Sequence, residues 1–246
     1  MSIRIVLVAL LIVSAPGALR AQSLEQRVAR VADGTVHLSF AARPGVCGSG
    51  TSINLRDGEN EREYECGQPQ VEVALRLHDH RVVDVRTYVG GRWRLAAAAI
   101  DLGTVRPQEA AAYFLTLAER GKDISGDPVL PAALADSVTI WPSLLRLARM
   151  ATLPDEMRRT AVFWLGQQAA AEAGKALDSI AGDKRGDREV RKQAVFALSQ
   201  REGEGVPALI RIARSNPDPE LRKTALFWLG QTEDPRALAL FEEILR

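Results

Sequence analysis

The stretch AVFWLGQ, residues Ala161–Gln167, occurs twice more in this chain with small changes. It returns as Ala194–Gln200 and as Ala225–Gln231, at spacings of 33 and 31 residues. Self-similarity at such a period is typical of a solenoid, in which each unit is too small to bury its own apolar face and stacks on its neighbours. The spacing therefore predicts an array of repeated units in the C-terminal part of the chain.

A second apolar pattern alternates with these copies and indicates that each unit contains two helices. It has two large apolar residues three positions apart and a third apolar residue directly after them, and it recurs at intervals of 33, 32 and 32 residues. Its four occurrences are Leu144, Leu147 and Ala148; Leu177, Ile180 and Ala181; Leu209, Ile212 and Ala213; and Phe241, Ile244 and Leu245. We expect the first helix of each unit to begin near Asp155, Asp187 or Asp218, because an acid at a helix start caps free N–H groups and complements the helix dipole.

A longer pattern links the copies of the first helix: an acid, a glutamate, an aliphatic residue and an arginine, followed by spaced small and apolar residues. Its positions are Asp187, Glu189, Val190, Arg191, Ala194, Ala197 and Leu198 in one copy, and Asp218, Glu220, Leu221, Arg222, Ala225, Trp228, Leu229 and Gly230 in the next. The first copy departs from it, with Pro154 where the others have the acid. This pattern resembles HEAT repeats, specifically the short HEAT-like type of phycobilisome-lyase-like proteins. The resemblance covers residues 142–246 and implies an armadillo-like helical solenoid that serves as a protein-binding scaffold.

Large aromatic residues recur on the first helices. Phe163, Phe196 and Phe227 occupy equivalent positions, and we expect them to pack between repeats. Trp164 and Trp228 share the face of the leucines, which favours core packing over a ligand-stacking role.

Arginines also recur at a fixed distance from the acids. Arg191 lies four residues after Asp187, and Arg222 lies four residues after Asp218. This spacing predicts an ion pair, either within the helix or between repeats.

The candidate binding surface follows from the resemblance, which implies that the second helices line the concave side of the array, where partners usually bind. Outward positions of these helices carry Arg146, Arg149, Arg211 and Arg214. Guanidinium groups form strong, directional hydrogen bonds to carboxylates. These four arginines are the predicted partner-binding residues, for a protein partner with an acidic segment.

Residues 1–21 have the pattern of a secretory signal peptide. Arg4 precedes the apolar run Ile5–Val13, and the small residues Ala18 and Ala21 close the segment. The apolar run is far shorter than the roughly 20 residues that span a bilayer. The sequence thus predicts export to the periplasm or the extracellular space, with no membrane span after signal removal.

Residues 22–95 are expected to form a small, mainly antiparallel β domain. Val36–Phe40, Val71–Leu77 and Val83–Val89 alternate apolar and polar residues, and the break between the last two predicts a hairpin. Residues 96–141 predict a helical lead-in or capping region with a helix over 107–120, and residues 142–246 hold the repeats. The predicted fold class is therefore α+β, with a β domain followed by an all-α solenoid.

The two cysteines, Cys47 and Cys66, lie 19 residues apart within the predicted β domain. In an oxidising compartment this spacing favours one disulfide, which would support a small core. The alternative is a reactive Cys47 in the glycine-rich stretch Gly45–Gly50. A catalytic thiol would need a nearby base and would leave Cys66 unexplained.

All three histidines lie in the same segment: His37, His78 and His80. They could imitate a zinc set if they converged. However, His78 and His80 flank Asp79 where the strand pattern breaks, which favours a solvated hairpin turn. The sequence accordingly predicts no metal site and no cofactor.

Charge and residue types limit the function. Loss of residues 1–21 leaves 30 basic and 31 acidic residues and a net charge of −1, whereas nonspecific nucleic-acid binding requires a positive excess. Some relatives of this repeat type hold a di-iron site, but residues 142–246 contain no histidine for it. No acid, base and nucleophile set is visible either. The sequence predicts an exported, non-enzymatic protein-binding scaffold; the alternatives are an enzyme of the HEAT-like lyase type and a purely structural envelope component.

Overall fold

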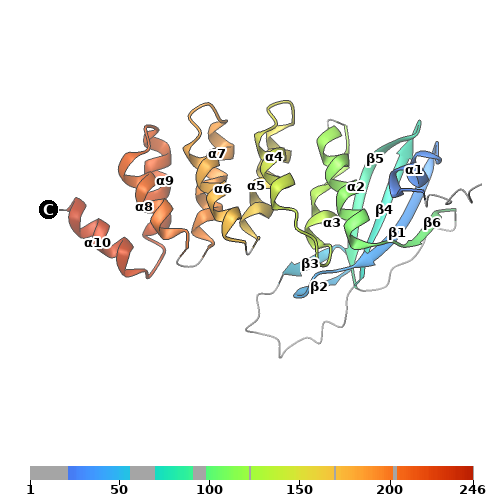
Figure 1. Cartoon of the computed structure of the whole chain (residues 1–246), viewed down its shortest axis with the longest axis horizontal. Helices are drawn as coiled ribbons and strands as arrows, with labels where there is room; N and C mark the ends of the chain where they lie inside the picture. The colour runs from blue at the N-terminus through green and yellow to red at the C-terminus, as the bar shows by residue number, and fades with distance from the viewer. Residues whose placement is uncertain are drawn as a thin grey trace, which may run out of the picture.

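The protein, described by a computed structural model over residues 22–55, 70–90, 98–121, 123–168, 170–201 and 204–245, combines a sheet with a row of helices. The sheet and the helices beside it lead into paired helices that extend away from it to the C-terminal end (Figure 1). The predicted order of an N-terminal sheet region and a C-terminal helical region is thus confirmed. The predicted signal peptide, residues 1–21, lies outside the described residues.

Within the described residues, five strands form one sheet in the order β6-β1-β4-β5-β7. They are β1 (Gly34–Ala41), β4 (Gln70–His78), β5 (Arg81–Val89), β6 (Ile100–Thr104) and β7 (Ser125–Gly126). The three central strands are antiparallel, as the alternating pattern predicts. β4 and β5 are joined through Asp79 and His80, whose φ angles of 50° and 58° fit the type I′ turn that matches the twist of a hairpin.

Two parts of this region differ from the sequence expectation. Strands β6 and β7 come from residues 96–141, expected to be helical, and they extend the two edges of the sheet by parallel pairing with β1 and β5. Such short edge strands carry too few residues for an alternating pattern, and their partners are remote in sequence. The glycine-rich stretch Gly45–Gly50 contains strand β2 (Val46–Ser49), which forms a hairpin with β3 (Ser52–Leu55).

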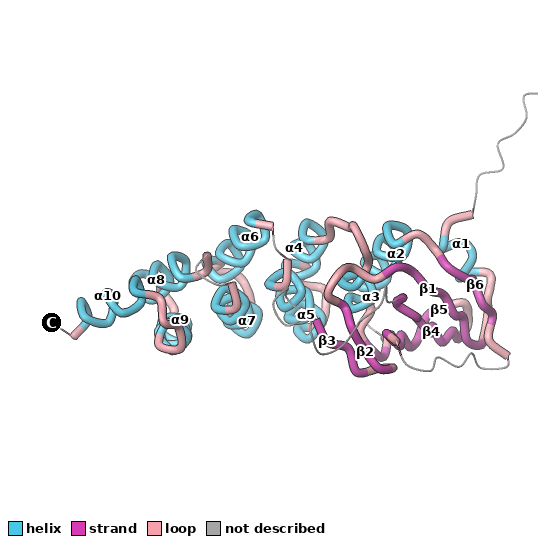
Figure 2. Tube along the Cα trace, turned by 90° about the horizontal axis from the view of Figure 1, so that it is seen from below, coloured by secondary structure: helices cyan, strands magenta, loops and turns pink. Residues whose placement is uncertain are grey.

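One face of the sheet is covered by helices (Figure 2). These are α1 (Leu24–Ala29), α2 (Pro107–Arg120) and α3 (Val129–Leu134). Val36, Leu38 and Phe40 of β1 are at most 1% exposed on this face. The Phe40 ring lies 6.3 Å from that of Phe114 on α2, measured between centroids. The predicted helix over 107–120 therefore forms with the expected bounds, and its buried face is fixed against the sheet.

The remaining helices form a two-layered array. They are α4 (Trp141–Arg149), α5 (Asp155–Gly166), α6 (Ala171–Gly182), α7 (Arg188–Ser199), α8 (Val206–Ser215), α9 (Pro219–Leu229) and α10 (Pro235–Ile244). Figure 2 shows α5, α7 and α9 in one row, and α4, α6, α8 and α10 in the other, in line with α2. We call the row of α2, α4, α6, α8 and α10 the second-helix layer.

The first helices begin as the acid pattern predicts, with one difference. The Asp187 carboxylate accepts hydrogen bonds from the N–H groups of Glu189 and Val190 at 2.9 and 3.0 Å. Asp218 caps α9 in the same way through the Glu220 N–H at 3.0 Å. Helix α5 has Pro154 at the capping position and no side-chain cap. This copy therefore lacks the capping hydrogen bond of the other two.

The arginine of the pattern makes contacts between repeats in one copy. The buried Arg191 guanidinium of α7 lies 3.5 Å from Asp218, the cap of α9 in the next repeat, so its ion pair is inter-repeat and not within the helix. Arg222 donates instead to the backbone carbonyls of Asn216 and Pro217, at 2.7 and 3.3 Å. Equivalent arginines thus bind different acceptors of the same loop.

The aromatic residues of the first helices are less uniform than predicted. Phe196 packs between repeats, with its ring centroid 5.0 Å from that of Trp228. Phe163 and Phe227 are 38% and 59% exposed, and each ring lies edge-on to the tryptophan that follows it. The expectation of inter-repeat packing was wrong for Phe163 and Phe227, because both side chains are largely exposed to solvent. Trp164 is 6% exposed, as its predicted core role requires.

Close approach of the first helices makes Gly166 sensitive to substitution. A Cβ at Gly166 would lie 2.9 Å from the Ala197 Cβ on α7, a separation that real Cβ atoms do not show. We expect Gly166→Ala to lower the free energy of unfolding by about 1–3 kcal/mol in urea titrations, because α5 and α7 must move apart. Gly182→Ala is the matched control, since a Cβ there meets no atom within 4 Å. Equal stability of the two variants would contradict close packing of α5 on α7.

Candidate functional site

The four predicted arginines all lie on the second-helix layer, and each reaches a neighbouring helix of that layer. Arg146 of α4 pairs with Glu119 of α2 at 2.5 Å. Arg149 of α4 donates to the Ser179 hydroxyl of α6 at 2.5 Å. From α8, Arg211 pairs with Asp178 of α6 at 2.5 Å, and Arg214 pairs with Glu243 of α10. The arginines therefore bridge the units along the whole array.

These bridges could not be read from the sequence alone. Each partner lies 27 to 33 residues away from its arginine, on another helix. The one available signal was that Asp178 precedes Arg211 by 33 residues, which is the repeat period itself. Exposed ion pairs of this kind contribute at most about 1 kcal/mol each. Their geometry nevertheless determines which arginines remain uncompensated.

Positive charge is left in excess at the centre of the second-helix layer. Arg149 contacts a hydroxyl and not a carboxylate. Lys175 is exposed on α6, one helical turn before Ser179, and has no ion-pair partner among the described residues. Arg149 reaches α6 from α4, whereas Lys175 lines, with Arg211, a shallow depression of about 350 Å³ between α6 and α8. This surface can attract carboxylates without first breaking an existing ion pair.

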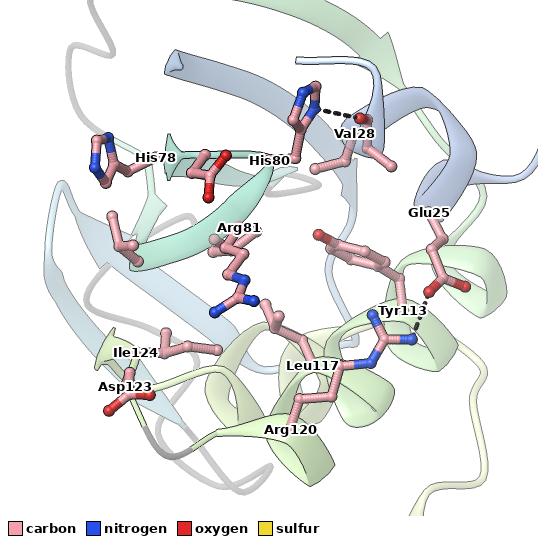
Figure 3. A pocket seen from close by; sticks show the side chains of 14 residues that line it. Glu25, Val28, His78, His80, Arg81, Tyr113, Leu117, Arg120, Asp123 and Ile124 are labelled. Carbon is pink, nitrogen blue, oxygen red and sulfur yellow. Dashed lines mark hydrogen bonds and ion pairs between the residues drawn. The ribbon is translucent and has the colours of Figure 1, made fainter. Parts of the chain in front are cut away.

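A second pocket, of about 650 Å³, lies beside the sheet (Figure 3). It opens between α1, the turn joining β4 to β5, and α2. The turn contributes His78, His80 and Arg81, while α2 contributes Tyr113, Leu117 and Arg120. Apolar side chains from α1 and from the segment after α2, Val28 and Ile124, complete the wall. This pocket could not be predicted from the sequence, because its three walls are remote in the chain.

Most charged groups around the pocket are paired. Arg120 binds Glu25 at 2.6 Å, and His78 Nδ1 lies 2.8 Å from the Asp33 carboxylate. The Asp79 N–H and the His78 side chain hold the pKa of Asp33 below its usual value. His80 Nδ1 lies 3.0 Å from the Ala29 carbonyl. Arg81 is exposed, and its guanidinium has no hydrogen bond or ion pair to any described residue.

The three histidines do not converge. His37 lies opposite Ala74 in the middle of β4, four residues before His78, and is 4% exposed. Burial lowers the pKa of His37, against the opposing effect of Asp101. Within the described ranges, no group of three or more His, Cys, Asp or Glu side chains is arranged to hold a metal ion. His78 is the last residue of β4 and His80 lies in the hairpin turn, close to the solvated turn that the sequence favours.

Two further sequence expectations fall partly outside the described residues. Cys66 is not among them, so the pairing of Cys47 with Cys66 stays a prediction. Within the part of the chain that the structure covers, no helix has both the length and the apolar character needed to cross a bilayer.

The paired helices have a counterpart among known families. A family model of HEAT repeats matches residues 184–246, the span that contains α7 to α10. Residues 184–246 are thus similar to HEAT repeats. No curated protein shows significant similarity to the chain. HEAT-like repeats generally bind other proteins through the extended surface that stacking creates, which makes the faces of this array the first place to seek a partner.

Proposed function

We propose that the protein is an exported scaffold that binds an acidic segment of another protein on the second-helix layer. The observation that carries this proposal is the uncompensated charge of Arg149, where α4 contacts α6, and of Lys175 on α6. Arg146, Arg211 and Arg214 each have a carboxylate partner within the array, so they contribute less net attraction. The pattern of residues 1–21 supports export.

The binding test compares two double variants with the same change in charge. Arg149→Ala with Lys175→Ala removes the excess charge without breaking an ion pair. Arg146→Ala with Arg214→Ala removes two cations that Glu119 and Glu243 already balance. Pull-downs from envelope extract are expected to lose the partner only with the first variant, and binding should weaken about tenfold or more. An unchanged partner with the first variant would reject this site, and the absence of any partner would count against the scaffold itself.

Export is tested separately, through the mature terminus of the protein. Mass spectrometry of the protein from the periplasm or the medium is expected to find a chain that begins at Gln22. Recovery of full-length protein from the cytoplasm alone would contradict export, whatever the result of the pull-down.

A further inference from the structure

A second binding site of different chemistry is suggested by the pocket between α1, α2 and the β4–β5 turn. We propose that this pocket binds a small monocarboxylate with an apolar body, whose carboxylate pairs with Arg81 and whose body packs against α1 and α2. A volume of about 650 Å³ lies within the range of small-molecule sites, which combine apolar walls with a few polar groups. The proposal is independent of the scaffold function, because none of the residues proposed to bind the acidic segment lines the pocket.

The polar part of the pocket is provided by Arg81 and Tyr113. Figure 3 shows the Arg81 guanidinium and the Tyr113 hydroxyl directed toward the middle of the pocket. Neither group has a hydrogen-bond partner among the residues that the structure describes. Burial raises the pKa of Tyr113, so its hydroxyl keeps its proton and can donate. A carboxylate between them would accept from a guanidinium and a phenol, the two kinds of donor left unused.

The other charged groups around the pocket leave Arg81 as the available cation. Arg120 is occupied by Glu25, and its ion pair closes the side of the pocket next to α1. The carboxylates of Asp79 and Asp123 also belong to the lining. They disfavour ligands that carry several negative charges, which is why the proposal is for a monocarboxylate and not for a phosphate or a nucleotide.

The apolar part of the pocket has a fixed shape. Val28 on α1 and Leu117 on α2 are 3% and 7% exposed, and Ile124 is half-buried. These side chains are held by the same packing that fixes both helices on the sheet. A ligand body of several methylene groups exposes apolar surface to water when free and buries it in the pocket. Each fully buried CH₂ favours binding by about 0.8 kcal/mol.

Isothermal titration calorimetry of the purified protein tests the two halves of the proposal with four probes. Octanoate is expected to bind with a Kd below about 1 mM. Acetate lacks the body, octanol lacks the charge and octylamine reverses it, so each should bind at least tenfold more weakly than octanoate. Failure of octanoate to bind, or equal binding of octanol or octylamine, would overturn the proposal.

Variants assign the binding to the pocket. Arg81→Ala is expected to weaken octanoate binding about tenfold, and Tyr113→Phe about threefold to tenfold, as loss of a charge-assisted and of a single hydrogen bond should. Arg106→Ala removes an exposed arginine just before α2, outside the pocket, and should bind like the wild type. Thermal unfolding checks that all variants are folded. Octanoate binding that is unaffected by Arg81→Ala in a folded protein would refute the assignment.

Discussion

Arg191→Ala is expected to lower the free energy of unfolding by about 3–5 kcal/mol, the range for breaking a buried charged interaction by removing one partner. The Arg191 side chain is almost fully buried, and its Nε donates to the Ala181 carbonyl of α6 at 3.2 Å. Its Nη2 donates to Asn216 at 3.3 Å, and its Nη1 lies 3.5 Å from Asp218. One side chain therefore contacts three acceptors, one on α6 and two in the loop between α8 and α9, and alanine would remove all three contacts.

Arg188→Ala is the matched control for this prediction. Arg188 approaches the same Asp218 carboxylate at 3.3 Å, but its side chain is 61% exposed. We expect its loss to cost less than about 1 kcal/mol, because water replaces an exposed partner. Urea unfolding of the two variants measures the difference. Similar small effects would mean that Arg191 is not what connects these repeats.

Arg191→Ala should also change how the stability of the protein depends on acidic pH. Burial alone would raise the pKa of Asp218, but the Glu220 N–H, Arg188 and Arg191 outweigh it and hold that pKa below its usual value of 3.8. A carboxyl whose pKa is lowered by folding contributes stability above its unfolded pKa, and that contribution is lost as the pH falls through the folded pKa. The stability difference between wild type and Arg191→Ala should therefore narrow below pH 3.8.

Phe114→Ala is expected to cost a similar amount, about 3–5 kcal/mol, the range for truncating a buried phenylalanine. Phe114 is fully buried where α2 meets the sheet, with Phe40 of β1 and Tyr113 of α2 as its aromatic neighbours at 6.3 and 5.3 Å. Truncation would leave a cavity between α2 and the sheet. Circular dichroism in urea would detect a lower midpoint.

Phe163→Ala provides the comparison on a helix of the array. Phe163 is 38% exposed, and its aromatic contact among the described residues is with Trp164 of the same helix. Its truncation should cost no more than about 1 kcal/mol, because little apolar area leaves the protein interior. A loss at Phe163 as large as that at Phe114 would mean that Phe163 is part of the packing between repeats after all.

The sequence predicted the elements whose signal is local. The repeated AVFWLGQ stretch located the first helices, and alternation in β1, β4 and β5 located the hairpin and the antiparallel centre of the sheet. Asp187 and Asp218 could be predicted to cap helices because capping involves only the next two or three residues, and both do so in the structure.

What the sequence could not predict depends on contacts between remote segments. β6 pairs with β1, which lies more than 60 residues earlier in the chain, and β6 is too short to show an alternation of apolar and polar residues. The arginine bridges join helices about one repeat apart, so three of the four arginines predicted to bind a partner are paired with carboxylates of the protein itself. The walls of the pocket come from residues near 25, 80 and 120, and only the folded chain brings Arg81 and Tyr113 to the same pocket.

Helix α2 belongs to both parts of the molecule. Its Phe114 is buried against the sheet, while its Glu119 binds Arg146 of α4. The array is therefore joined to the sheet through a shared helix and not through a flexible linker. A flexible linker would present a bound partner over a range of positions and raise its effective concentration at every one of them. A shared helix instead fixes the distance and the orientation between a partner bound on α4 and α6 and a ligand bound in the pocket beside the sheet.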